Sequence, residues 1–290
     1  MINEIAIGNG TGNSVTIGND PAKDYDFVLD SVDWDTPAVT MNTSHIPNQV
    51  GASLNGVTVG TRKPMIAGYV VANTKKIDMT GLTWEEYYKK QLEMIEANKE
   101  KLNSIISVMR DVVIRANNYV LDGRPSLPPK YATDEKRNNE VMCYFELNFE
   151  CFNPLFHTEV SDKLEMPNPT TEYTVNNDGQ ATIGMRIAID FTGTVEKPTF
   201  TNATRGETVK VEKTFAAGDR ISIVTKTGDE NIYIERGGIG YPHVYLASVD
   251  SKFPKLQVGN NRLSFSAASG ASNMNVKVTY MKEFYTLKEM

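Results

Sequence analysis

The sequence predicts a mainly β protein with an N-terminal β-sheet domain, one long helix in that domain, and a C-terminal β-sandwich. Three patterns support this fold class. A capping box opens an apolar helical repeat near residue 83, and strict two-residue alternation marks a strand over 141–151. From about residue 170, short apolar runs alternate with turn residues and no helical period returns. We place the domains at 1–165 and 166–290.

The amino-acid composition is that of an ordinary globular protein. The 290 residues are 40% hydrophobic and 23% charged, which is typical of globular chains. The net charge is −6, so the chain lacks the basic surface with which dedicated nucleic-acid binders neutralise phosphates. The first residues show neither a basic segment nor an apolar segment of a signal peptide, and no apolar run is long enough to span a bilayer. We therefore expect a protein made in the cytoplasm, without membrane insertion.

The first seventy residues favour strands and tight turns. Ile5–Ile7 and Val15–Ile17 flank a Gly/Asn-rich link in which Asn9-Gly10 favours a primed turn, so a hairpin is expected. Asn55-Gly56 gives the same signal between residues 52–54 and 57–59, and predicts a second hairpin. Another strand is expected at 65–71.

One long helix is expected at about 83–108. Thr83 and Glu86 have the spacing of a capping box, in which each side chain accepts a hydrogen bond from the other residue's backbone amide. Apolar residues then recur at three- and four-residue steps, at Leu92, Ile95, Leu102, Ile105, Ile106 and Met109. We expect Trp84, Tyr87 and Tyr88 to pack the start of the helix onto the sheet.

The clearest strand runs from Val141 to Cys151, where alternate side chains are apolar and the others polar. Cys143 and Cys151 lie eight residues apart on it, about 27 Å in extended chain, which is beyond disulfide reach. Both thiols are therefore expected to be small core residues. A Pro-rich turn precedes the strand at 125–129, and Met166–Pro169 is interpreted as a linker or boundary.

Eight short strands in the second half predict a β-sandwich or a closed jelly-roll-like fold. They are expected at 173–175, 185–191, 207–211, 220–225, 231–235, 241–247, 261–265 and 276–280.

Residue patterns for catalysis and cofactor binding are missing from the sequence. His45, His157 and His243 do not lie at metal-ligand spacing from one another or from a cysteine. Gly8-Asn-Gly10-Thr-Gly12 links two strands without a following helix, so we interpret it as turn chemistry rather than a nucleotide site. The acidic run from Asp20 to Asp35 fits no calcium loop and is expected to be a solvated face. We expect no enzyme activity, no cofactor and no metal.

Sugar binding stays open as an alternative, because aromatic side chains on a β-sandwich can stack against sugars. Both tryptophans, Trp34 and Trp84, lie in the first half, which leaves Tyr233, Tyr241 and Tyr245 as possible glycan contacts. Strand tyrosines are more often core or rim residues than binding platforms.

Several short motifs follow one another along the chain. In the first half they are Gly51-Ala-Ser-Leu-Asn-Gly56, Val59-Gly-Thr-Arg62, Ile66-Ala-Gly-Tyr69 and Cys151-Phe-Asn-Pro154-Leu-Phe156. In the second half they are Asn177-Asp-Gly179, Pro198 to Glu207, Ala217 to Ile223 and Ser251 to Leu263. The order of these motifs resembles that of the distal tail protein (Dit) family of long-tailed phages. The long helix and the 125–129 segment depart from shorter family members.

The resemblance implies a structural protein of the virion tail tip. Six copies would form a ring from their N-terminal domains, around a channel through which DNA passes, and the C-terminal domains would be galectin-like. The expected partners are the tail tube protein, a tail-associated hub or lysin protein, and a receptor-binding or fibre protein. A closed ring suits head-to-tail contacts, and an acidic channel wall would not retain DNA. The alternatives are a carbohydrate-binding accessory module for host cell-surface glycans and, less favoured, a tail-associated hydrolase.

Overall fold

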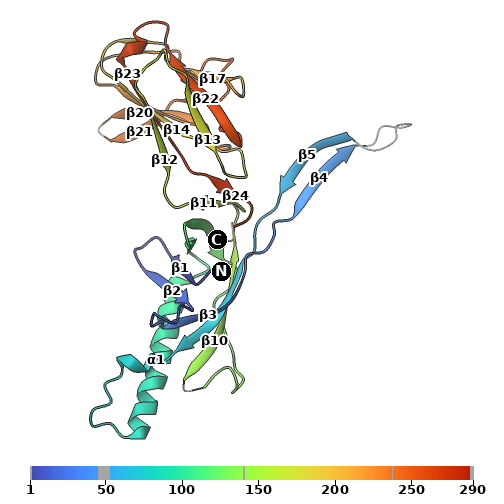
Figure 1. Ribbon diagram of the computed structural model, residues 1–290, viewed down its shortest axis with the longest axis vertical. Coiled ribbons are helices and arrows are strands. Elements are labelled where there is room, and N and C mark those ends of the chain that lie inside the picture. Colours follow the sequence, from blue (N-terminus) through green and yellow to red (C-terminus); the bar gives the residue numbers. More distant parts are fainter. Residues whose placement is uncertain (1, 45–52, 140, 237, 288–290) are drawn as a thin grey trace. The chain divides into compact units, whose positions relative to one another are not determined.

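The computed structural model describes residues 2–44, 53–139, 141–236 and 238–287, and it divides into two compact units (Figure 1). The first unit runs to Phe156 and also includes Leu287, and the second runs from His157 to Thr286. The sequence places the division at 165/166, beside a segment rich in proline. The strand Asp162–Met166 explains the difference, because it pairs with Met274–Tyr280 and so belongs to the second unit.

The first unit is a closed β-barrel. Its hydrogen-bonded order is β8 (Tyr119–Pro125), β7 (Val112–Ala116), β1 (Glu4–Gly8), β2 (Ser14–Gly18), β3 (Phe27–Asp33), β6 (Met65–Val71) and β10 (Met142–Glu150). The ladder closes because β10 also pairs with β8 at Phe149 and Glu150. A short strand, β9 (Lys130–Tyr131), lies on the same edge of β10. Closure removes the free edges that would otherwise invite pairing with other chains.

Alternation along β10 confirms the predicted strand and its phase. Phe145, Leu147 and Phe149 point into the barrel and are buried, whereas Glu146 and Asn148 are partly exposed. Cys143 and Cys151 are free and buried, as expected. The hairpin of β1 and β2 is also confirmed, with Ile5 opposite Ile17 and Gly10 and Gly12 at positive φ in the link.

Helix α1 (Trp84–Ile105) lies against β2 and β6, preceded by a 3₁₀ turn, η1 (Thr74–Lys76). The capping box is confirmed, since Thr83 Oγ1 accepts from the Glu86 amide at 3.3 Å and the Glu86 carboxylate accepts from the Thr83 amide at 2.8 Å. Ile95, Leu102 and Ile105 face the barrel. The helix ends three residues before the predicted end.

The prediction that aromatic residues at the start of α1 pack onto the sheet is wrong for Trp84 and Tyr88, whereas Tyr87 is partly buried. Trp84 is 70% exposed and Tyr88 is 46% exposed, and Leu92 is exposed on the same face. These turns extend past the barrel strands, at the lower end of the first unit in Figure 1, so no sheet lies opposite them.

The hairpin predicted at Asn55-Gly56 is also wrong. Residues 53–59 form one strand, β5 (Ser53–Val59), that pairs with β4 (Val39–Ser44), and Gly56 lies opposite Asn42 within that ladder. Gly56 does not have the positive φ that a primed turn requires, and a bulge between Asn42 and Thr43 absorbs the extra residue. The flanking segment predicted at 52–54 begins outside the described residues.

The second unit is a sandwich of a six-stranded and a four-stranded sheet. The first has the order β12 (Asp162–Met166), β23 (Met274–Tyr280), β14 (Arg186–Phe191), β19 (Arg220–Val224), β20 (Asn231–Arg236) and β21 (Ile239–Pro242). The second has the order β13 (Tyr173–Asn177), β22 (Gly259–Ser266), β16 (Thr199–Asn202) and β17 (Glu207–Lys210). The remaining short elements are β11 (Phe156–Thr158), β15 (Val195–Glu196), β18 (Thr214–Phe215), η2 (Val244–Leu246), η3 (Ala271–Asn273) and β24 (Glu283–Phe284).

Between the two sheets lies an apolar core built from alternate residues of both, including Ile187, Phe200, Ile223 and Phe265. Phe191 and Phe215 stack with centroids 4.6 Å apart. Seven of the eight predicted strands appear within about two residues of their expected bounds. The exception is 241–247, where β21 ends at Pro242 and a 3₁₀ turn follows, because proline cannot donate to a strand ladder.

Candidate functional site

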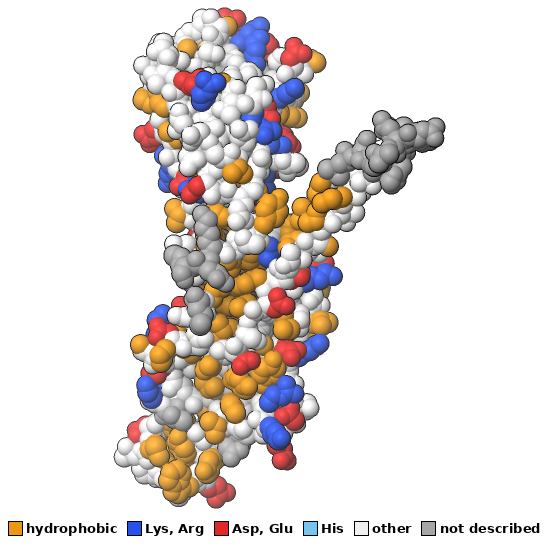
Figure 2. Space-filling view, turned by 45° about the vertical axis from the view of Figure 1, so that its right-hand side comes forward, with side chains coloured by type: hydrophobic (Ala, Val, Ile, Leu, Met, Phe, Trp, Pro, Cys, Tyr) orange, Lys and Arg blue, Asp and Glu red, His pale blue; other side chains and the backbone are white. Residues whose placement is uncertain are grey.

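The strand pair β4–β5, here called the arm, presents an apolar face that no other described element covers. In its ladder Val39 lies opposite Val59 and Met41 opposite Val57, so these four side chains share one face of the arm. Met41 is 66% exposed, and Val39 and Val57 are also exposed. The arm extends away from the barrel, with hydrophobic side chains along it (Figures 1 and 2). An isolated two-stranded ladder is marginally stable in water, so a covering partner would stabilise it.

A second exposed apolar surface is the aromatic stripe of α1, formed by Trp84, Tyr88 and Leu92 at four-residue spacing. Trp84 packs edge-on against Tyr87 with centroids 6.0 Å apart. Exposed tryptophan and tyrosine are the residues most enriched in the energetic centres of protein interfaces.

The root of the arm is fixed by a buried arginine. Arg62 is 2% exposed, and its Nε donates to the Pro154 carbonyl at 2.7 Å. Nη1 donates to the carbonyls of Trp34 and Asp35 at 3.1 and 2.9 Å. The guanidinium also lies 4.5 Å from the centroid of the Phe156 ring. Burial lowers the pKa of Arg62 from its ordinary value, because the charged form loses its water.

The tyrosines predicted as glycan contacts lie on or beside the edge strand β21, but they do not form one platform. Tyr233 alternates with the buried Ile232 and Ile234 and therefore points to the outer face of the sheet. Tyr241 lies opposite Ile234, so its side chain points to the same inner face of the sheet as Ile234. It is half-exposed because it lies at the sheet edge. Tyr245 follows in η2, is 74% exposed, and hydrogen-bonds His243 Nδ1 through its hydroxyl at 2.8 Å.

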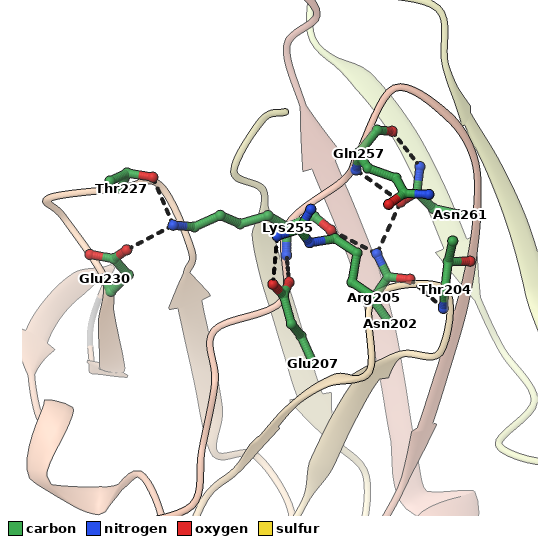
Figure 3. A network of polar contacts seen from close by, with 9 residues as sticks. All are labelled: Asn202, Thr204, Arg205, Glu207, Thr227, Glu230, Lys255, Gln257 and Asn261. Atoms are coloured by element: carbon green, nitrogen blue, oxygen red, sulfur yellow. Dashed lines mark hydrogen bonds and ion pairs between the residues drawn. The ribbon is translucent and has the colours of Figure 1, made fainter. Parts of the chain in front are cut away.

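Two of the second-half segments that carried the resemblance, Pro198 to Glu207 and Ser251 to Leu263, meet in one polar network (Figure 3). Asn202 and Asn261 are fully buried, and Asn202 Nδ2 donates to Asn261 Oδ1 at 3.1 Å and to the Lys255 carbonyl at 2.7 Å. Asn261 Oδ1 accepts from the Gln257 amide, and its Nδ2 donates to the carbonyls of Gln257 and Gly259. These contacts hold the loop between 253 and 259, which would otherwise bury unpaired backbone groups.

Charged side chains complete the network around the same loop. Glu207 accepts from Arg205 at 2.8 Å and from the Lys255 amide at 2.9 Å. Burial acts to raise the pKa of the Glu207 carboxyl, but the bonds from Arg205 and the Lys255 amide outweigh it and hold the pKa below 4.5. The ammonium of Lys255 donates to Thr227 and Glu230 at 2.7 and 3.2 Å.

The titratable residues in the described part of the chain do not gather into a metal site. No set of three or more His, Cys, Asp or Glu side chains there converges as metal ligands. In the acidic run, Asp24 pairs with Lys75 and Asp26 with Lys76, and Asp35 accepts from backbone amides. Burial raises the pKa of Cys151 to about 12, so that thiol is protonated and unreactive at neutral pH. His45 lies outside the described residues.

An open depression of about 700 Å³ lies at one end of the barrel, lined by the β1–β2 link, residues 110–113, Asp122 and Phe152. Asp111 at its rim is paired with Arg124 at 2.8 Å. In the described part of the chain, no helix is long and apolar enough to cross a bilayer.

Both the sequence of the second unit and the fold of the chain are similar to those of known phage tail proteins. Residues 178–284 match the sequence family described as the siphovirus-type tail component, C-terminal domain. The whole chain superposes on the Dit protein of phage SPP1, with a TM-score of 0.63 and 13% identity over 97% of this chain and 99% of that one. The structure of the phage P2 baseplate, in its activated conformation with calcium, gives a TM-score of 0.47 at 9% identity over 97% and 98%. A comparison with curated proteins returned no match.

The SPP1 Dit protein is known as a paradigm of the hub adsorption apparatus in phages that infect Gram-positive bacteria. The family match covers most of the second unit, including the network around Asn202 and Asn261, and the SPP1 superposition covers both units. The resemblance inferred from the sequence is therefore confirmed: the second unit matches the siphovirus-type tail component C-terminal domain family, and the chain as a whole has the fold of a Dit protein.

Proposed function

We propose that this chain is a structural component of a siphophage tail tip, located in the virion and assembled into a ring that joins the tail tube to the baseplate hub. The observation that carries the proposal is the match of residues 178–284 to a siphovirus tail component domain. The fold shared with SPP1 Dit over nearly the whole chain supports the same role for the first unit.

In the proposed assembly, six copies form a homo-hexamer with the first units around a channel. The exposed apolar faces of the arm and of α1 support an assembling protein, because monomeric proteins seldom leave such surfaces uncovered. The partners are the tail tube protein, a tail-associated hub or lysin protein, and a receptor-binding or fibre protein. DNA would only pass, since the net charge of −6 disfavours retention. The role requires no catalytic step.

The mass of the purified chain in solution tests the ring. Light scattering over a concentration series is expected to give about 190 kDa, which is six chains of 32.2 kDa. A stable monomer at all concentrations that also fails to bind a tail tube protein would refute the proposal.

A carbohydrate-binding module remains the second candidate, and the observation that favours it is Tyr245. Its ring is exposed and its hydroxyl is oriented by His243, so it could stack on a sugar without a large loss of side-chain freedom. A glycan array compares the natural chain with Tyr245→Ala, Tyr241→Ala and Tyr233→Ala. Binding that is lost in Tyr245→Ala supports this candidate, and no binding across the array removes it.

A further inference from the structure

Three segments that are distant in the sequence meet at the Arg62 side chain. Trp34 and Asp35 lie just before the arm, Arg62 lies just after it, and Pro154 and Phe156 end the first unit. The guanidinium donates to carbonyls in the first and third of these segments and lies over the Phe156 ring. Residues 153–156 are called the exit segment below.

Further contacts hold the arm side of this junction. Asp35 has a φ of 54°, and its carboxylate accepts from the Thr36 amide at 2.7 Å and from the Lys63 amide at 2.9 Å. The two chains that lead into and out of the arm are therefore joined at Asp35. The Asp35 carboxylate has no described contact with the exit segment. The Asp35 carbonyl accepts a hydrogen bond from Arg62, and Arg62 in turn donates to the Pro154 carbonyl.

The chemistry of the side chain explains why arginine occupies this position. A buried cation is costly unless its donors are satisfied, and carbonyls from separate segments satisfy them only when all three segments are in place. The planar fork donates in several directions at once, which the single ammonium of lysine cannot reproduce. Removing one carbonyl therefore leaves part of a buried charge unsatisfied and changes the free energy of the other contacts.

We propose that Arg62 is a positioning residue that couples the conformation of the arm root to that of the exit segment. Displacement of either segment weakens the hold of Arg62 on the other. The coupling is reciprocal, because an effect of one segment on the other through a shared contact must act equally in the reverse direction. The inference concerns contacts within the first unit and goes beyond the proposed structural role.

The test is a mutant cycle on the full-length chain, read by amide hydrogen exchange of the peptide that covers residues 152–156. Asp35→Gly removes the carboxylate without straining the positive φ. We expect it to increase exchange in the exit segment by about fivefold or more, which corresponds to the lower end of typical coupling energies. In an Arg62→Met background, Asp35→Gly is expected to add nothing further to that exchange.

Two further variants separate coupling from general destabilisation. Arg62→Lys keeps the charge and most of the aliphatic stem, so it replaces Arg62→Met if that variant does not fold. In the Arg62→Lys background, Asp35→Gly should increase exchange in the exit segment by less than it does in the natural chain. Arg124→Met removes an exposed arginine paired with Asp111. In that background, Asp35→Gly should increase exchange in the exit segment as much as it does in the natural chain.

Two results would overturn the proposal. The first is an unchanged exit segment in Asp35→Gly. The second is an effect of Asp35→Gly on the exit segment that persists without the Arg62 guanidinium. That result would assign the coupling to the edge-on contact of Trp34 with Phe156, whose centroids lie 5.4 Å apart, or to the backbone pairing of residue 62 with Cys151.

Discussion

At the scale of single residues, buried polar side chains determine the loops of the second unit. Asn177 donates to the carbonyls of Ala181 and Leu256, and Asn261 makes the equivalent bonds at the start of β22. Each side chain replaces the water that these backbone groups would lose on burial. The residues that suggested the family therefore act by holding loop geometry.

The first prediction compares two neighbouring asparagines. Asn261→Ala should lower the free energy of unfolding of the second unit by about 2–4 kcal/mol, because it leaves several buried backbone groups without partners. Asn260→Ala changes an exposed side chain and should cost less than about 0.5 kcal/mol. Urea denaturation of the two variants measures the difference. Similar losses in both would mean that the network is not what holds the loop.

The second prediction concerns pH and Glu207. Its folded-state pKa lies below 4.5, so the carboxylate stabilises the fold fully above about pH 4.5 and loses that contribution as pH falls through the folded-state value. Glu207→Gln removes the charge, and its stability should fall less steeply than that of the natural chain as the pH falls below 4.5. Denaturant midpoints across that range provide the measurement, and parallel curves would contradict it.

At the scale of elements, periodicity determines which residues share a face. The alternation in β10 carries Phe145, Leu147 and Phe149 into the barrel, and the helical repeat of α1 carries Ile95, Leu102 and Ile105 onto it. The same repeat continues through Leu92 and Tyr88 to Trp84, which are exposed. A stripe thus shows which side of a helix is apolar, but its burial depends on how far the opposing sheet extends.

The third prediction tests the phase of β10. Phe145→Asp places an unpaired charge at a fully buried position and should unfold the first unit. Glu146→Lys alters a partly exposed residue of the opposite face and should change the melting temperature little. Calorimetry on the full chain is the measurement. If both variants melt alike, the assignment of faces is wrong.

At the scale of the whole molecule, two units with separate cores carry different surfaces. The first unit has the uncovered arm and the aromatic stripe, and the second has the edge strand β21 and the exposed Tyr245. Exposed apolar faces on a projecting strand pair are costly for an isolated chain, so their retention fits a protein that is completed by assembly.

The fourth prediction links the arm to assembly. Met41→Glu adds a charge to the exposed apolar face of β4, so it should leave the melting temperature of the isolated chain nearly unchanged. The same charge should reduce the mass measured by light scattering, because burying it in a contact between copies is unfavourable. Thr40→Glu, on the other face of the arm, is the matched control. Equal masses for Met41→Glu and the natural chain would show that this face is not part of the ring contact.

Local and periodic patterns in the sequence were sufficient to predict several features of the fold. The capping box at Thr83 and Glu86, the phase of β10 and the turn glycine Gly10 between β1 and β2 need only neighbouring residues to specify them. Their hydrogen bonds and backbone angles are set within a few positions along the chain. The resemblance to Dit proteins also followed from the order of such local motifs.

Which distant residues a local motif contacts depends instead on how the segments of the chain pack together. Asn55-Gly56 has the composition of a turn, but it lies within β5 because pairing with β4 satisfies its backbone groups in the extended form. Closure of the barrel joins β8 to β10, and Arg62 meets carbonyls 27 to 92 residues away. Such contacts became visible only in the folded chain, because a single sequence carries no periodic signal for them.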